Sequence, residues 1–349
     1  MTDVHGEKAR DLAAAVLEQV LKWKDGGAGV VLATVVKAWS TAPRRAGTQM
    51  AVHENGTHFG TLFGGSVDTL VVSAALGVLA EGKDAMVNVS VDDATASAAG
   101  MACGGGLEIR LECIDGIGRG GQGGQVDVLR EALDAMRSGH SVVLCTGLAD
   151  GRRLLISGDG PASGAWASEA HKRARMDDTA IALVDGDEVL FQVFNAPLRL
   201  FVVGAVRTAR ALRDAAQLIG FEVTIIEPRD AHAAGTEFAG ANMLVGDVGA
   251  TLRSLHLDSR CAVVVLAHMP EIDDPALIEA VRSHVFYIGA LGSRKSHAAR
   301  LARLEQAGVT AEQSARIHGP AGLDIGAIGP AEIAASIVAE MVSVLRKPH

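Results

Sequence analysis

The stretch RLFVVGAVRTARALRDAAQLIGFEVTIIEPR, residues 199–229, decides the fold of this chain. An apolar run from Leu200 to Val203 meets Gly204, a helical pattern follows, and a second apolar run ends at Glu227. A strand, a tight glycine turn, a helix and a second strand form the βαβ unit that opens a dinucleotide-binding domain. Strand and helix patterns keep alternating afterwards, so we predict a Rossmann-like, doubly wound parallel sheet over residues 196–349.

The phosphate-binding turn of this unit departs from the dinucleotide fingerprint. Where G-x-G-x-x-G/A is expected, the chain reads GAVRTA at residues 204–209. Val206 replaces the glycine that lets a pyrophosphate approach the backbone, and Arg207 adds a positive charge on the first helical turn. Glu227 ends the second strand, where an acidic residue often binds a ribose hydroxyl. Three interpretations stay open: a vestigial loop, a site for an anionic nucleotide or a pterin phosphate, and ordinary NAD binding.

Length and composition limit the classes of protein. A chain of 349 residues predicts roughly two domains of about 150 residues. Hydrophobic residues make up 48%, which excludes wholesale disorder, and the net charge of -9 argues against a general nucleic-acid surface. The N-terminus is charged and amphipathic, and no apolar run is long enough for a membrane span. The four cysteines form no CxxC pair, so we expect neither a zinc site nor a disulfide framework, and we expect a cytoplasmic protein.

The first part of the chain has a less regular pattern, which predicts a mixed α/β domain over residues 1–195. Asn55-Gly56 predicts a hairpin turn, and Ser66 is expected to cap a helix that runs to about Leu79. We place the domain boundary near Asn195-Ala196-Pro197. The predicted helices are 7–24, 66–79 and 126–137, and the predicted strands are 30–36, 49–53, 57–62, 87–91, 107–113 and 141–146, followed by a meander to 194.

Two further segments of the second domain follow its predicted strands. Residues 287–295 combine Gly289, Gly292, Ser293 and Arg294 at the start of a helix, which predicts an anion cradle at the carboxyl edge of the sheet. The alternative is a solvated helix start that Ser293 merely caps. His268 follows another strand and is a weak candidate, since a lone histidine is more often a satisfied polar residue than a ligand.

A glycine-rich run between two helical patterns, residues 318–326, is a further candidate. Gly322 is expected to supply a turn with positive φ. Asp324 either binds a ligand or caps the turn, and the sequence does not choose between these roles.

The first domain offers two glycine-flanked candidates, Gly64-Gly65-Ser66 and Cys103-Gly104-Gly105. A thiol in a backbone nest has a lowered pKa and could bind a soft metal or carry sulfur. The alternative, slightly favoured by spacing alone, makes Cys103 a small buried hydrophobe.

Several of these segments together carry a resemblance to a known family. They are residues 40–44 with Gly47, residues 60–66, residues 103–105 with Glu108, residues 204–206 with Ala209, residues 220–221 and 228–229, His268, residues 287–294, residues 318–326, residues 330–334 and residues 339–340. In these marks the chain resembles the xanthine dehydrogenase accessory proteins (XdhC-type), which are also found in carbon monoxide dehydrogenase clusters.

The resemblance implies a two-domain chaperone that binds molybdenum cofactor (molybdopterin). Such a protein protects the cofactor, supports its sulfuration by a cysteine desulfurase and delivers it to a molybdenum hydroxylase. It also implies a homodimer and no turnover of its own. The candidate positions named above would then hold the cofactor, with Cys103 as a metal ligand.

Two positions depart from the family pattern. The family has Gly-Gly-Cys followed by Glu where this chain has Gly64-Gly65-Ser66-Val67-Asp68, and serine is a much poorer molybdenum or sulfur ligand than thiolate. The family has His where this chain has Arg207, which cannot act as a neutral base but can hold a phosphate. The alternatives are a diverged NAD(P)- or nucleotide-dependent oxidoreductase and a purely protein-binding partner of a hydroxylase.

Overall fold

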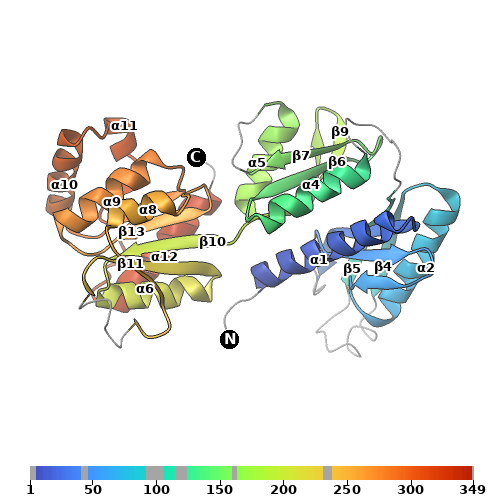
Figure 1. Cartoon of the computed structure of the whole chain (residues 1–349), viewed down its shortest axis with the longest axis horizontal. Helices are drawn as coiled ribbons and strands as arrows, with labels where there is room; N and C mark the ends of the chain where they lie inside the picture. Colours follow the sequence, from blue (N-terminus) through green and yellow to red (C-terminus); the bar gives the residue numbers. More distant parts are fainter. Residues whose placement is uncertain are drawn as a thin grey trace. The chain divides into compact units, whose positions relative to one another are not determined.

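The computed structural model (Figure 1) describes residues 5–40, 46–91, 105–114, 124–158, 163–230 and 238–347. Contacts between Cα atoms divide the chain into two compact units. One runs from Glu7 to Ala196, and the other holds Pro197 to His349. Among the described helices, none combines the length and apolar character that a membrane span needs.

The first unit contains two antiparallel sheets. A five-stranded sheet has the order β3-β2-β1-β5-β4, and a four-stranded sheet has the order β7-β6-β9-β8. The strands of the larger sheet are β1 (Val30–Ser40), β2 (Gln49–His53), β3 (His58–Gly60), β4 (Ala85–Val91) and β5 (Gly105–Cys113). Those of the smaller sheet are β6 (Val142–Gly147), β7 (Arg153–Ser157), β8 (Ala180–Val184) and β9 (Asp187–Phe194).

Helices join these two sheets into one unit. Apolar side chains of α1 (His5–Asp25) and α4 (Gln125–Arg137) share one core with residues from both sheets. Helix α2 (Gly65–Glu81) packs on the other face of the larger sheet, and α5 (Ala165–Met176) packs on the smaller one. Helix α5 lies within the segment where the sequence indicated only a meander.

The second unit is built on one parallel sheet with the order β12-β11-β10-β13-β14-β15. Its strands are β10 (Leu198–Val203), β11 (Phe221–Glu227), β12 (Asn242–Val245), β13 (Cys261–Val265), β14 (Tyr287–Ala290) and β15 (Ile317–His318). The order reverses between β10 and β13, which is the point where open α/β sheets bind their ligands. The predicted fold class, a Rossmann-like parallel sheet with a mixed α/β domain before it, is confirmed.

Helices cover both faces of this parallel sheet. Helices α6 (Arg207–Leu218) and α12 (Pro330–Arg346) pack on one face. The other face is covered by α8 (Val248–Ser254), α9 (Pro270–Arg282) and α10 (Arg294–Gln306), and a short α11 (Ala311–Ser314) follows. Helix α9 begins earlier than the sequence pattern indicated, because Pro270 occupies its first turn, where a missing N–H costs nothing.

Candidate functional site

The turn after β10 is built around Gly204. Its φ is +101°, and a Cβ at this position would lie 2.9 Å from the backbone nitrogen of Ala267. Only glycine therefore fits between this turn and the loop after β13. Val206 follows in an extended conformation and leads into α6. The turn keeps the close approach of a nucleotide-binding unit although its middle glycine is absent.

Glu227 has a different role from the ribose contact that the sequence predicted. Its side chain is fully buried. The backbone N–H of Ala205 donates to Oε2 at 2.7 Å, and Arg229 donates Nε to Oε1 at 2.7 Å and Nη2 to Oε2 at 2.8 Å. The N–H of Arg229 adds a fourth bond at 3.0 Å. The carboxylate thus has no acceptor site left for a sugar hydroxyl, and it fixes the turn instead.

Hydrogen bonds also set the charge of Glu227. Burial alone would raise the pKa of this carboxyl, but the hydrogen bonds from Arg229 and from the N–H of Ala205 outweigh it and hold the pKa below its usual value. Arg229 reaches further, since its Nη1 lies 3.3 Å from Sδ of Met269 in the loop after β13. The Glu227–Arg229 pair therefore links the turn after β10 to a second loop of the same sheet edge.

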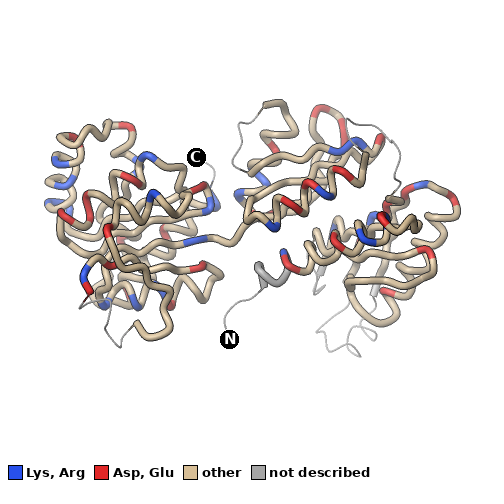
Figure 2. The backbone as a smooth tube through the Cα atoms, viewed as in Figure 1, with Lys and Arg blue, Asp and Glu red and all other residues tan. Residues whose placement is uncertain are grey.

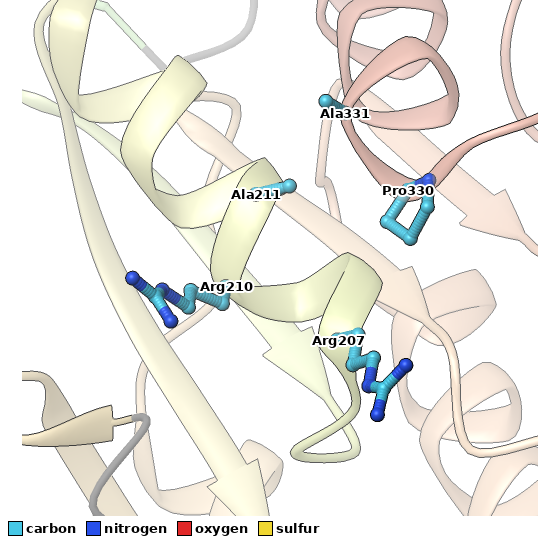
Figure 3. Close-up of a pocket in the computed structure, with 5 residues that line it drawn as sticks. All are labelled: Arg207, Arg210, Ala211, Pro330 and Ala331. Carbon is cyan, nitrogen blue, oxygen red and sulfur yellow. The ribbon is translucent and has the colours of Figure 1, made fainter.

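An open hollow of about 500 Å³ lies beside the start of α6, and its lining residues are Arg207, Arg210, Ala211, Pro330 and Ala331. Figure 3 shows Arg207 at the first turn of α6, facing the side on which α12 begins with Pro330. Arg207 is exposed and has no ion-pair partner among the described residues. An unpaired guanidinium at a helix N-terminus favours an anionic group at this position.

The loop between β14 and α10 has the cap that the sequence predicted. The N–H of Ser296 donates to Oγ of Ser293 at 3.1 Å, so Ser293 is the N-cap of α10. Gly292 before it has a φ of +143°, and Gly289 lies within β14, where a Cβ would come within 2.7 Å of the ring of Tyr287. Arg294 is exposed on the first turn, and Figure 2 shows that basic residues gather along α10.

The glycine-rich run before α12 is held by Glu340. The Glu340 carboxylate accepts hydrogen bonds from Oη of Tyr287 at 2.5 Å and from the N–H of Gly322 at 2.8 Å, and it lies 3.3 Å from Nδ1 of His318. Gly322 has a φ of +98°, as the sequence predicted for a turn glycine. One helix residue therefore sets the path of the whole loop.

Two of the predicted site residues meet across this edge. Arg294 Nη2 lies 3.9 Å from Asp324 Oδ2, and both side chains are almost fully exposed. An ion pair this open to solvent stabilises the fold little, so both groups stay available to a ligand. His268 lies in the next loop, after β13, with a φ of +58° that few non-glycine residues adopt.

The first unit differs from prediction at the start of α2. Gly64, with a φ of +102°, is the N-cap, and Gly65 is the first helical residue. Ser66 lies exposed on the first turn and does not cap the helix. The carboxylate of Asp68 satisfies the free N–H groups instead, because it accepts from residues 62, 63 and 64 at 3.0–3.1 Å and from Oγ1 of Thr61 at 2.5 Å.

The second candidate of the first unit is only partly visible. Cys103 and Gly104 lie outside the described residues, and Gly105 begins β5. The three described cysteines are free and buried, and burial raises the pKa of Cys145 and of Cys261 to about 12. No cluster of three metal-binding side chains occurs within the described part of the chain. The expected metal role of Cys103 stays a prediction.

Sequence reasoning did not identify four functional neighbours: Asp68, Arg229, Asp273 with Arg300, and Glu340. A signal existed for Asp68, because an acidic residue just inside a helix start often binds free N–H groups. Glu340 lies in the middle of α12, where local pattern marks only a helix face. Its partner Tyr287 is 53 positions away, so only the folded chain reveals the contact.

Comparisons with known proteins give matches in both units. Residues 200–341 match the model of the XdhC Rossmann domain. Residues 23–90 match the model of the XdhC and CoxI family. The two matches lie in different units of the chain, so both parts are typical of one family.

Curated relatives match along most of the chain. A protein of Escherichia coli (strain K12) named molybdenum cofactor insertion chaperone PaoD is 25% identical over 91% of this chain and 84% of its own length. A protein of Bacillus subtilis (strain 168), named as a probable xanthine dehydrogenase component, is 26% identical over 91% of this chain and 93% of its own length.

A solved structure has the same fold. The crystal structure of a protein described as a xanthine dehydrogenase, from Bacillus halodurans, aligns with a TM-score of 0.51 and 23% identity, covering 96% of each chain. At this identity the likeness concerns the fold alone.

Proposed function

Because the chain belongs to the XdhC and CoxI family, we propose that it is a molybdenum cofactor chaperone that serves the maturation of a molybdenum enzyme. The cofactor is its cargo. The protein protects the cofactor, supports its sulfuration and delivers it to a hydroxylase of the xanthine or carbon monoxide dehydrogenase type. The relative from Escherichia coli, named an insertion chaperone for this cofactor, supports the proposal.

The single observation that carries this proposal is the exposed, unpaired Arg207 at the hollow between the starts of α6 and α12. The phosphate of a molybdopterin carries negative charge, and the helix N-terminus together with Arg207 and Arg210 presents positive charge. Arg294, Ser293 and Asp324 add polar groups at the same sheet edge. These groups fit a phosphorylated pterin, which needs both an anion contact and polar contacts along its ring.

The sulfuration part of the proposal assigns no sulfur-carrying residue to Ser66. Ser66 is exposed on the first turn of α2, and a hydroxyl is a poor sulfur acceptor compared with a thiolate. We propose that the sulfur comes from a cysteine desulfurase acting on the bound cofactor. We further propose that the protein is a cytoplasmic homodimer.

The alternative function, a diverged NAD(P)- or nucleotide-dependent oxidoreductase, has weaker support. Val206 stands where the pyrophosphate would approach the backbone, and the buried Glu227 binds Arg229 and the N–H of Ala205 rather than a ribose. A thermal-shift screen with NAD, NADP, ATP and CTP separates the two functions. Stabilisation that grows with the concentration of one of these ligands would favour the oxidoreductase.

Equilibrium ultrafiltration with isolated molybdenum cofactor tests the chaperone function, with molybdenum measured in the retained fraction. We expect one cofactor per chain at micromolar concentration, and we expect Arg207→Gln to weaken binding about tenfold, since a charge-assisted contact contributes roughly 1.5–3 kcal/mol. Arg282→Gln is the matched control, because Arg282 is an exposed arginine on the last turn of α9. A wild-type protein that retains no molybdenum would overturn the proposal.

A further inference from the structure

A buried charge pair lies below the loops of the carboxyl edge. Asp273 on the first part of α9 is 2% exposed, and Arg300 on α10 is 4% exposed. Arg300 Nη2 lies 3.8 Å from Asp273 Oδ2, too far for a good hydrogen bond. Neither side chain belongs to the candidate site described above, although both lie directly behind its loops.

Each partner of this pair holds one of the site loops. Arg300 Nη2 donates to the backbone carbonyl of Leu291 at 2.9 Å, next to Gly292 in the loop after β14. Asp273 interacts with the backbone N–H of Ala267, in the loop after β13. Ala267 is also the residue against which Gly204 packs. A continuous path therefore joins three loops through two buried side chains.

This arrangement costs stability rather than adding to it. Asp273 Oδ1, Arg300 Nε and Arg300 Nη1 are buried and have no hydrogen-bond partner among the described residues. Burial raises the pKa of Asp273 and lowers the pKa of Arg300, which is the direction expected for charges with too few partners. An apolar pair of similar volume often stabilises a core at least as well as a buried ion pair.

We propose that Asp273 and Arg300 are positioning residues that fix the spacing between the loops after β13 and after β14, and so shape the cofactor site without touching the cofactor. The inference rests on the proposed function for its ligand. It assigns the pair to binding rather than to stability. The loops concerned are residues 266–269, with His268, and residues 291–293, with Ser293.

The double variant Asp273→Leu/Arg300→Met tests this role, because it removes both ties and leaves no buried charge alone. We expect it to melt close to the wild type and to bind molybdenum cofactor about tenfold more weakly, as loss of an outer-shell partner typically does. We also expect faster amide hydrogen exchange in peptides that cover residues 265–270 and 290–295.

A neighbouring pair on the same two helices provides the control. Arg303 Nε donates to Asp274 Oδ2 at 2.6 Å, and no described contact ties either residue to a site loop. The variant Asp274→Leu/Arg303→Met should leave affinity and exchange unchanged. Wild-type affinity and wild-type exchange in the Asp273/Arg300 variant would overturn the inference.

The exchange measurement keeps the inference separate from the proposed function. If the wild-type protein binds no cofactor, the proposed function fails, and the exchange data alone then decide whether the pair positions the loops. Faster exchange confined to the two loops supports the inference, and unchanged exchange overturns it. An equal loss of affinity in the Asp274/Arg303 variant would also overturn it, because the effect would then belong to the helix contact.

Discussion

At the scale of single residues, Gly204 shows how one missing side chain positions a loop. Ala at this position would be strained by the positive φ and would also contact the backbone of Ala267. Gly220 has a similar φ of +92° but open space around it. Gly220→Ala should therefore cost about 1–2 kcal/mol of unfolding free energy, and Gly204→Ala about 1–3 kcal/mol more. Urea unfolding measures both values, and equal losses would show that the contact with Ala267 is not tight.

Glu227 leads to a prediction about acid stability. Its pKa in the folded protein is lower than the ordinary value of 4.5, so its stabilising effect is complete above that value and is lost as the pH falls. Between about pH 6 and about pH 3.5 the wild type should lose more unfolding free energy than Glu227→Gln, which cannot titrate at this position. The comparison uses urea midpoints at both pH values. Parallel losses in the two proteins would mean that Glu227 is not the responsible group.

At the scale of elements, the start of α2 depends on Asp68 and not on Ser66. Asp68 accepts three backbone N–H groups and the hydroxyl of Thr61, while Ser66 is exposed. We expect Asp68→Ala to cost about 2 kcal/mol, the scale of losing a charged cap, and Ser66→Ala to stay within about 0.5 kcal/mol. Thermal and urea unfolding of the two variants provide the check. A larger loss for Ser66→Ala would assign the cap to the serine after all.

The predictable elements were those with a strong local pattern. The strands and helices that flank Gly204 follow from alternating apolar runs and a helical period, and both lie within a residue or two of their predicted bounds. Helix α5 was missed because its sequence, AWASEAHKRARM, has only a weak apolar face. Helices α8 and α11 are too short for a period to be visible.

At the scale of the whole molecule, residues 197–349 contain both cores of the parallel sheet, one on each face. Domains with their own core generally fold alone. We therefore expect a fragment of residues 197–349 to be folded, with one cooperative thermal transition in circular dichroism. The Arg207→Gln fragment should melt at the same temperature, since Arg207 is exposed. A fragment without a cooperative transition would show that this unit depends on the rest of the chain.

Local sequence was enough to specify the βαβ unit, the tight turn at Gly204, the cap at Ser293 and the gathering of candidate loops at one sheet edge. These features depend on apolar period and on glycine or hydroxyl residues, which act over a few positions. The partners of the buried charges, in contrast, were fixed only in the folded chain. Glu227 binds Arg229 and Ala205, Asp273 faces Arg300, and Glu340 holds Tyr287. A buried charge must find its partner among groups that folding brings close, and their distance along the chain leaves no local pattern.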